Sequence, residues 1–515
     1  MSTDRKIAFA VGVSWLSRAI SILANLVLIP ILFRFISKEE LGLWFLLGNS
    51  QSFLNLLGMG ITPTLTRHIA LTKGTIKEEN LTPTKKETIG DIVTTGRTLL
   101  RILGSIMFFV AWGIGYKLIN NLELQTISAI TVIYAWTFMC LSYTINVWIS
   151  YLDCLLIGFG YVGIKYSIGL GTSIFTITAN ILVAISGGGI IELSLISLIS
   201  VIIQRLVFLI FLKWKKNDIL SIKGQWNWSI AKKMFPPSFN SWLTSLGEFL
   251  ILRTDQYFIA IFAGAQNIPA YHAAYQLASN LRVLAISIPI SSSTFISQMW
   301  QSKKIKQIHN LVIRNSRLSL LIMACGSCFL LITGREITNI WLGENIFIGY
   351  PILMTFCLMF IFEVQNICLI YSSRATEDEN YTVSSLSAGV LNIIFTSILI
   401  RPLGLWGVSL STLISQMLTN NWYALYRPLR RLKLKLKKYT NEVLVPCFFW
   451  TIMALLITYL TKYILIHNNY LNHIFVVIIA TSLSCLIVFL LAIWNTVLQA
   501  EHKDKVLLKV KSIIW

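Results

Sequence analysis

The sequence predicts an all-α integral membrane protein with about fourteen transmembrane helices, arranged as two pseudo-symmetric six-helix bundles and a C-terminal helical hairpin. Of its 515 residues, 55% are hydrophobic and only 13% are charged, whereas soluble domains carry about 25% charged residues. The mean hydropathy is +0.69. The apolar residues gather in long runs, and Lys and Arg concentrate in alternate loops. Because even a large soluble domain keeps a polar shell, this composition excludes an ordinary soluble enzyme.

The predicted spans are apolar runs of about 20 residues, the length that a helix needs to cross a hydrocarbon core about 30 Å thick. Segments 41–62 and 271–297 are the most polar among them. The spans are predicted at 9–33, 41–62, 99–119, 127–149, 163–186, 190–212, 236–263, 271–297, 316–334, 348–371, 382–400, 403–425, 444–466 and 472–497.

The positive charge indicates the orientation of the chain. Lys and Arg number 43 against 22 Asp and Glu, which gives a net charge of +21. Cytoplasmic loops of membrane proteins retain positive charge, so we expect a multi-pass membrane protein with both termini in the cytoplasm. Nucleic acid is not needed as a partner to explain this charge. With this topology the opposite side holds only Arg34, Lys38, Lys117, Arg335, Arg401 and Lys462.

A weak internal repeat predicts two similar halves. Ser37–Trp44, which leads to Pro63, resembles Ala265–His272, which leads to Pro289. Parallel repeats of this kind are a known plan of transporters, with the substrate site between the halves. The predicted organisation is a bundle at 1–212, a cytoplasmic linker at 213–235, a second bundle at 236–426, a basic cytoplasmic loop at 427–443, and an extra helix pair with an amphipathic basic tail at 444–515.

No motif predicts an enzyme, a metal site or a bound cofactor. The sequence holds neither a Gly-x-x-x-x-Gly-Lys-Ser/Thr phosphate loop nor a His-Glu-x-x-His motif. The glycines of Gly158–Gly163 match a dinucleotide fingerprint, but they lie between two spans without a βαβ context and are interpreted as a turn. Cys325 and Cys328 lie in an apolar span, where packing of small residues explains them. The predicted outer loops, such as 186–189 and 467–472, are too short for a catalytic domain.

Polar side chains recur at helical spacing inside several spans. Such groups are costly in hydrocarbon, so a stripe of them on one face indicates a cavity or a helix contact. The residues predicted to line an aqueous cavity are Ser14, Ser21, Asn25, Asn49, Ser52, Asn55, Ser241, Ser245, Tyr275, Gln276 and Ser279.

Charged residues within the spans are the main candidates for function. Arg18 and Arg282 have no acid within their own helical turn, and we expect both to line a cationic cavity that binds substrate. Arg253 is a third candidate for substrate binding, although it could instead pair with a neighbouring acid. Arg205 lies near the cytoplasmic end of its span and is expected to extend to the membrane surface as an anchor. The acids that could couple transport to a proton or sodium gradient are Glu248, Asp255 and Glu363.

Several segments resemble one family in their order and spacing. Pro30 closes the first span, and it is followed by Ser37–Trp44, Gly58–Ala70, Asp255–Tyr257 with Ala273–Tyr275, and Ile340–Gly343. With these segments the chain resembles, over essentially its whole length, the multidrug/oligosaccharidyl-lipid/polysaccharide (MOP) exporter superfamily. Within that superfamily it looks most like the polysaccharide transporter branch of O-antigen and capsule flippases.

The resemblance implies two six-helix bundles around a central cavity that work by alternating access. It also implies a substrate, undecaprenyl-diphosphate-linked oligosaccharide, that is moved across the inner membrane for polysaccharide biosynthesis. The expected partners are this lipid-linked oligosaccharide, membrane lipids, a polysaccharide polymerase and a chain-length regulator, and the protein is expected to act as a monomer. Arginine suits such a substrate because its guanidinium binds phosphate through two charge-assisted hydrogen bonds.

Other functions remain open from the sequence. A flippase for lipid II or another envelope lipid would share the fold. A cation-coupled multidrug exporter would use carboxylates in its cavity, and the acids in the spans keep this function open. A membrane glycosyltransferase or polymerase is disfavoured, because such enzymes need a sizeable outer loop.

Overall fold

The computed structural model describes residues 20, 23, 26–73, 82–215, 217–301, 303–376, 378, 380–467 and 474–497. These residues form helices joined by short connections, and none of them forms a strand. The predicted all-α class is therefore confirmed. The side chains of residues 51–60 and Ser241 lie outside the description, as do residues 1–19, 21, 22, 24 and 25.

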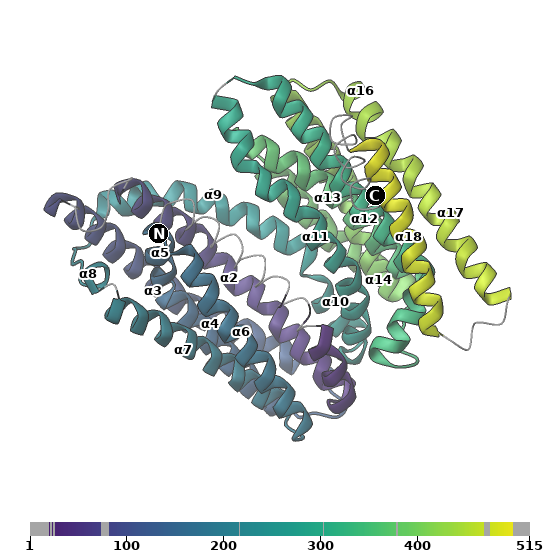
Figure 1. Cartoon of the computed structure of the whole chain (residues 1–515). Coiled ribbons are helices and arrows are strands. Elements are labelled where there is room, and N and C mark those ends of the chain that lie inside the picture. The colour runs from purple at the N-terminus through teal and green to yellow at the C-terminus, as the bar shows by residue number, and fades with distance from the viewer. Residues whose placement is uncertain are drawn as a thin grey trace, which may run out of the picture. The chain divides into compact units, whose positions relative to one another are not determined.

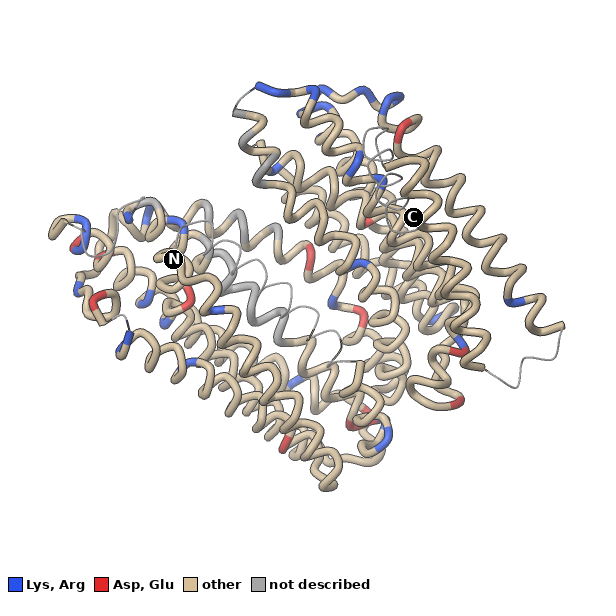
Figure 2. Tube along the Cα trace, in the orientation of Figure 1, with Lys and Arg blue, Asp and Glu red and all other residues tan. Residues whose placement is uncertain are grey.

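Nine helical stretches among the described residues are long and apolar enough to cross a membrane. The chain is thus a multi-pass membrane protein. Charged residues gather near the ends of the helices, and long stretches between them carry none (Figure 2). Helices also cover the more polar spans predicted at 41–62, 236–263 and 271–297. The nine stretches are Pro83–Asn120, Ala129–Gly158, Val162–Ile185, Ile190–Lys215, Ile305–Leu342, Tyr350–Arg374, Thr382–Arg431, Leu436–His467 and Ile474–Thr496.

The chain divides into two compact units, residues 1–269 and 270–515. The sequence predicted the second bundle to begin at residue 236, in the helix Trp228–Leu252. That helix packs against Lys38–Lys73 of the first unit. The boundaries of the two six-helix bundles remain predictions.

In the first unit, α4 packs against both α3 and α7, and α6 packs against α7 (Figure 1). α2 packs against α3, α5 and α9. Leu65, Ile69, Ile89, Leu152 and Leu156 are completely buried in its core. The helices of this unit are α2 (Lys38–Lys73), α3 (Pro83–Asn120), α4 (Ala129–Ile149), α5 (Tyr151–Gly158), α6 (Val162–Ile185), α7 (Ile190–Lys215), α8 (Asn217–Leu220), α9 (Trp228–Leu252), α10 (Asp255–Phe262) and the short 3-10 helix η2 (Ala265–Asn267).

Polar caps set the starts of three of these helices. Thr82 caps α3, where Pro83 occupies the first turn, and its hydroxyl accepts a hydrogen bond from the Lys85 N–H. Ser128 caps α4 in the same way, and the Asn227 side chain accepts hydrogen bonds from two N–H groups at the start of α9. The first N–H groups of a helix have no partner within it, so side-chain oxygens stabilise these ends, and proline is tolerated there.

Two acids at the start of α2 hold neighbouring connections in place. The Glu39 carboxylate accepts hydrogen bonds from the N–H groups of Gln125 (2.7 Å) and Thr126 (2.6 Å), between α3 and α4. Burial alone would raise the pKa of Glu39, but these hydrogen bonds and one from the Thr126 hydroxyl outweigh it, and the pKa lies below its ordinary value. Glu40 accepts a hydrogen bond from the N–H of Ile190, the first residue of α7.

In the second unit, α12 packs against α13, α17 and α18. Where α12 contacts the last two helices, Cys325 and Cys328 lie buried against Ala454, Cys485 and Val488, so these cysteines serve as small packing residues. The helices of this unit are α11 (Ile268–Gln301, from Ala270 onward), α12 (Ile305–Leu342), α13 (Tyr350–Arg374), α14 (Thr382–Leu418), α15 (Asn420–Arg431), α16 (Leu436–Tyr439), the π-helix η3 (Thr440–Leu444), α17 (Val445–His467) and α18 (Ile474–Thr496).

Helix α14 covers the first of two predicted spans, 382–400, and most of the second, 403–425. It contains Pro402 and a sharp kink at Gly404, whose backbone has φ +56° and ψ −137°. An L-amino acid with a side chain rarely adopts this conformation, whereas glycine adopts it readily. The two predicted spans therefore correspond to two helices that meet at the kink, and α15 follows the second of them.

Candidate functional site

An ion pair between two helices is the centre of the candidate site in the second unit. Arg282 of α11 donates a hydrogen bond to Glu363 of α13 over 2.8 Å. The Arg282 side chain is 18% exposed and that of Glu363 is 15% exposed. The guanidinium carbon of Arg282 also lies 5.4 Å from the centre of the Phe360 ring. The pair is thus largely buried, and it has an aromatic face beside it.

The sequence singled out both residues but assigned them to different roles. It marked Arg282 as a substrate-binding cation because no acid lies within its own turn, and Glu363 as an acid for ion coupling. The structure brings them together from positions 81 residues apart. No spacing within one helix could reveal this pair, because it depends on which faces of α11 and α13 meet. The signal in the sequence was an arginine and a glutamate within two different predicted spans.

Aromatic side chains surround the pair. Tyr275, two helical turns before Arg282, has its ring centre 5.4 Å from that of Phe360 and 5.5 Å from that of Phe356. Arg282 and Tyr275 therefore share the face of α11 that meets α13. Tyr271 packs edge-on against Phe356. The site thus combines one cation, its counter-ion and a wall of aromatic rings.

The other predicted polar residues of α11 have local partners. The Gln276 amide donates a hydrogen bond to the Asn280 side chain over 2.9 Å, and Ser279 is buried. One turn after Glu363, the buried Asn366 donates a hydrogen bond to Asn421 of α15 over 2.6 Å. The polar face of α13 therefore continues from the ion pair toward α15.

A second polar cluster lies in the first unit, where α9 and α10 are separated by a break at Arg253. The Asn49 side chain of α2 donates a hydrogen bond to the Arg253 carbonyl oxygen over 2.6 Å and accepts one from its guanidinium over 3.4 Å. The Tyr257 hydroxyl donates a hydrogen bond to Ser50 over 2.6 Å. The sequence marked Asn49 and Arg253 but missed Ser50 and Tyr257. Arg253 is exposed, and its neighbour Asn49 is buried.

The remaining predicted residues are placed as follows. Ser245 is half-buried and Glu248 is exposed on α9, and Asp255 is buried at the first position of α10. Seven predicted residues lie outside the described part of the chain, wholly or in their side chains: Ser14, Arg18, Ser21, Asn25, Ser52, Asn55 and Ser241.

The expectation that Arg205 reaches the membrane surface is wrong. Arg205 is 5% exposed, it forms an ion pair with Asp153, and its guanidinium also donates a hydrogen bond to Asn146. The ring of Phe208 lies beneath the guanidinium. A side chain extends to the surface only when water is its best partner. Here a carboxylate and an amide from neighbouring helices provide partners inside the unit.

The described residues contain no group of three or more His, Cys, Asp and Glu side chains that could hold a metal ion.

Comparisons with known proteins agree on the fold. Residues 164–346 match a family model described as polysaccharide biosynthesis protein. The lipid II flippase MurJ in an inward closed conformation is similar, with a TM-score of 0.70 and 15% identity, and the match covers 94% of this chain and 98% of that one. An inward-facing multidrug resistance MATE transporter of the MOP superfamily is also similar, with a TM-score of 0.65 and 15% identity over 80% of this chain and 95% of that one.

A third similar structure is a MOP superfamily transporter from Pyrococcus furiosus. Its TM-score is 0.56 at 14% identity, and the match covers 83% of this chain and 94% of that one. The search of curated protein sequences found no match. The chain is therefore a multi-pass membrane protein with the fold of the MOP superfamily of transporters, as its sequence predicted.

Proposed function

We propose that this protein is a flippase that moves undecaprenyl-diphosphate-linked oligosaccharide across the bacterial inner membrane by alternating access, for the biosynthesis of a surface polysaccharide such as O-antigen or capsule. The proposal is transport and involves no covalent chemistry. The family match supports the link to polysaccharides, because the description of that family is polysaccharide biosynthesis protein. The MurJ-like fold supports a lipid-linked substrate.

The observation that carries the proposal is the Arg282–Glu363 pair. An isolated cation inside the membrane is costly, and a counter-ion reduces that cost while no substrate is bound. A diphosphate presents two negative charges, and its oxygens match the two-pronged geometry of the guanidinium. The substrate therefore competes with Glu363 for Arg282, and loss of the substrate restores the ion pair. The site is thus suited to bind an anion and to release it.

The aromatic residues suit the rest of this substrate. Phe360 lies beneath the cation and is completely buried, and Tyr275, which packs against it, is only half-buried and keeps part of its surface accessible. Aromatic rings supply apolar contact area with little loss of conformational freedom, and a tyrosine hydroxyl adds a hydrogen bond. The accessible part of Tyr275 would suit the apolar face of a sugar ring, while the buried rings hold Tyr275 and Arg282 in place.

The test is complementation of a flippase-deficient strain with membrane protein levels checked by immunoblot. Compared at matched membrane levels, Arg282→Ala should abolish complementation, because losing a charge-assisted hydrogen bond costs about 1.5–3 kcal/mol, or one to two orders of magnitude in affinity. Arg282→Lys should restore it only partly, because an ammonium group cannot form the guanidinium fork.

Arg401→Ala is the matched control. Arg401 is an exposed arginine of the same unit, outside the ion pair, and its loss should leave complementation unchanged. Full complementation by Arg282→Ala would refute the role of the cation and would favour the multidrug exporter.

The remaining sequence predictions belong to the same proposal. Arg18 and Arg253 are proposed as further substrate-binding residues, and both termini are proposed to face the cytoplasm. The proposed partners include a polymerase and a chain-length regulator, and the proposed state is a monomer.

Coupling to a proton or sodium gradient is proposed for Glu248 and Asp255. If Glu248→Gln combined with Asp255→Asn leaves transport equally sensitive to collapse of the gradient, that coupling role is wrong.

A lipid II type flippase is the second candidate function. The match to MurJ covers 94% of this chain, whereas the match to the inward-facing MATE transporter covers 80%. Transport assays with lipid II and with lipid-linked oligosaccharide, each in vesicles containing the purified protein, separate the two flippases. A drug-efflux assay tests the exporter.

A further inference from the structure

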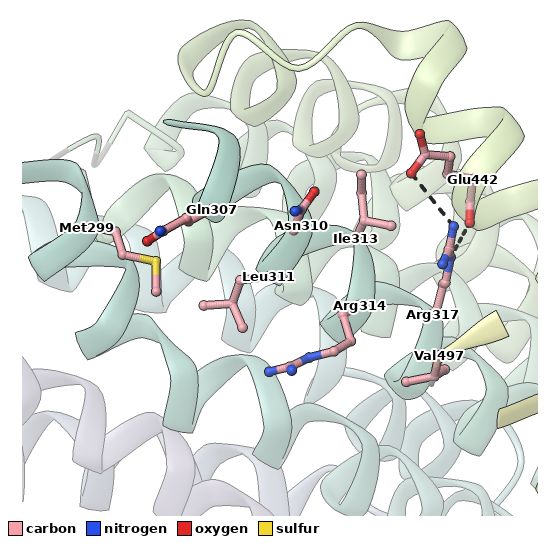
Figure 3. A pocket seen from close by; sticks show the side chains of 9 residues that line it. All are labelled: Met299, Gln307, Asn310, Leu311, Ile313, Arg314, Arg317, Glu442 and Val497. Carbon is pink, nitrogen blue, oxygen red and sulfur yellow. Dashed lines mark hydrogen bonds and ion pairs between the residues drawn. The ribbon is translucent and has the colours of Figure 1, made fainter. Parts of the chain in front are cut away.

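A pocket of about 410 Å³ lies in the second unit, away from the Arg282–Glu363 pair (Figure 3). It opens where the ends of α11, α12, η3 and α18 meet. Its volume lies within the range of about 300–1,000 Å³ that is typical of ligand sites. It is lined by Met299, Gln307, Asn310, Leu311, Ile313, Arg314, Arg317, Glu442 and Val497.

The lining residues share one level of the membrane. The spans predicted at 271–297 and 472–497 end beside Met299 and Val497, and those predicted at 316–334 and 444–466 begin beside Arg317 and Glu442. All four of these span ends lie on the side proposed to be cytoplasmic. The pocket therefore lies at the boundary between hydrocarbon and water in the cytoplasmic leaflet.

Arg317 is held in place by two other elements. Its guanidinium donates hydrogen bonds to the carbonyl oxygens of Glu442 in η3 and of Thr496 at the end of α18. The Glu442 carboxylate lies 3.7 Å away, and Figure 3 shows both contacts with Glu442. Arg317 thus joins α12 to the α17–α18 pair through two hydrogen bonds and an ion pair.

Arg314 differs from Arg317. It is exposed, and among the described residues no carboxylate pairs with it and no acceptor binds it. Its side chain extends past Leu311 into the open space of the pocket (Figure 3). The amides of Gln307 and Asn310 lie on the same helix and supply further hydrogen-bond donors. The pocket therefore offers one available guanidinium with amide donors nearby.

We propose that this pocket binds the phosphate headgroup of an anionic phospholipid from the cytoplasmic leaflet, with Arg314 as the main phosphate ligand. The inference rests on the proposed orientation. The inner leaflet is rich in anionic lipids, and basic pockets between helix ends on that side suit their headgroups. Met299, Leu311 and Val497 provide apolar wall for the start of the acyl chains, which a free inorganic anion would not need.

A bound headgroup has a structural consequence. The pocket is lined by α11, α12, η3 and the end of α18, so a ligand that contacts all of them stabilises the α17–α18 pair on α12. A ligand that binds the folded protein and not the unfolded chain raises the unfolding temperature in proportion to the logarithm of its concentration. Lipid binding is therefore measurable as a thermal shift.

The experiment uses the intact protein purified in detergent. Its thermal unfolding is followed during titration with phosphatidylglycerol or with phosphatidylcholine, and retained lipid is counted by native mass spectrometry. Phosphatidylglycerol should raise the unfolding temperature and phosphatidylcholine should not. Arg314→Gln should weaken the phosphatidylglycerol response at least about tenfold in concentration, because one charge-assisted contact is lost.

Arg430→Gln is the matched control, because it removes the same charge from an exposed site on the same side and outside the pocket. Its response should equal that of the unmodified protein. Asn310→Asp is a second variant that keeps the shape of the pocket and adds a negative charge beside the phosphate. It should also weaken the phosphatidylglycerol response.

Three results would overturn the proposal: equal responses to both lipids, an unchanged phosphatidylglycerol response in Arg314→Gln and Asn310→Asp, or a full response to inorganic phosphate alone. The last result would identify a free anion as the ligand. Complementation of the flippase-deficient strain is measured separately, so failure of lipid binding and failure of the proposed transport function are distinguishable.

Discussion

Arg205 and Arg282 are both arginines within predicted spans, but their surroundings differ. Arg205 has two partners, Asp153 and Asn146, and its side chain is 6% exposed. Arg282 pairs with Glu363, packs over Phe360, and is 18% exposed. A guanidinium enclosed by fixed partners serves packing, whereas one that remains partly accessible can exchange its counter-ion for a ligand. This difference distinguishes a structural arginine from a functional one.

Arg205→Ala should destabilise the protein. It leaves the Asp153 carboxylate, whose side chain is 13% exposed, without its counter-ion. Removing one partner of a buried pair costs about 3–5 kcal/mol, because a charge remains buried without compensation. We expect reduced membrane levels by immunoblot and a lower unfolding temperature.

The double variant Arg205→Met with Asp153→Asn serves as the control for this interpretation. It removes both charges, and it should recover much of the stability lost in the single variant. If Arg205→Ala accumulates and unfolds like the unmodified protein, the pair has no structural role.

At the scale of elements, the Asp378 carboxylate in the connection between α13 and α14 binds this connection to α15. Asp378 accepts hydrogen bonds from the Arg427 guanidinium at 2.6–3.1 Å and from the Ser373 hydroxyl at 2.9 Å. Burial raises the pKa of Asp378, but the hydrogen bonds from Arg427 and Ser373 outweigh burial, and the pKa lies below its ordinary value.

A lowered pKa gives the direction of the pH dependence. The carboxylate of Asp378 stabilises the fold above its pKa in the unfolded chain, and this contribution is lost as the pH falls through its lower folded value. Asp378→Asn should therefore lower the free energy of unfolding at pH 7 by about 1.5–3 kcal/mol, which is seen as a lower unfolding temperature. At strongly acidic pH the variant and the unmodified protein should be equally stable.

Glu344→Gln is the control for the pH series, because Glu344 is exposed in the same unit. Its substitution should change stability by less than about 0.5 kcal/mol. A difference between Asp378→Asn and the unmodified protein that stays constant from pH 7 to acidic pH would contradict the assignment.

The kink of α14 gives a second prediction at this scale. A Cβ added at Gly404 would meet no atom within 4 Å, so any cost of Gly404→Ala comes from its backbone conformation. We expect a loss of about 1–3 kcal/mol, the usual cost of placing a non-glycine residue in such a region. Thermal unfolding of the purified protein measures it.

Gly113→Ala is the matched substitution. Gly113 lies within helix α3, and a Cβ there would also meet no atom within 4 Å. Because alanine favours helix over glycine, this change should be neutral or stabilise by up to about 1 kcal/mol. If both substitutions change the free energy of unfolding equally, the backbone conformation at position 404 does not require glycine.

At the scale of the whole molecule, the alternation of basic loops predicts an even number of spans and two cytoplasmic termini. A fusion of alkaline phosphatase, which is active only outside the cytoplasm, within 467–472 should be active. A fusion after Trp515 should be inactive. Activity at the C-terminus would overturn the even number of spans.

The sequence predicted most of the helices because the signal for a membrane helix is local. An apolar run of about 20 residues favours the bilayer wherever it occurs in the chain. The helices α13, α17 and α18 accordingly lie close to the predicted spans. The break at Arg253 was less predictable, because hydrophobicity alone does not report backbone geometry.

By itself, the sequence determined the all-helical membrane class and the order of the helices, because hydrophobic runs and basic loops act locally, and its resemblance to the MOP superfamily predicted the fold. Tertiary structure decided the partners. Arg282 and Glu363 are 81 residues apart, and Arg205 and Asp153 are 52 residues apart. Whether a buried charge is compensated depends on which helix faces meet, and that is set by side-chain packing between helices distant in the chain.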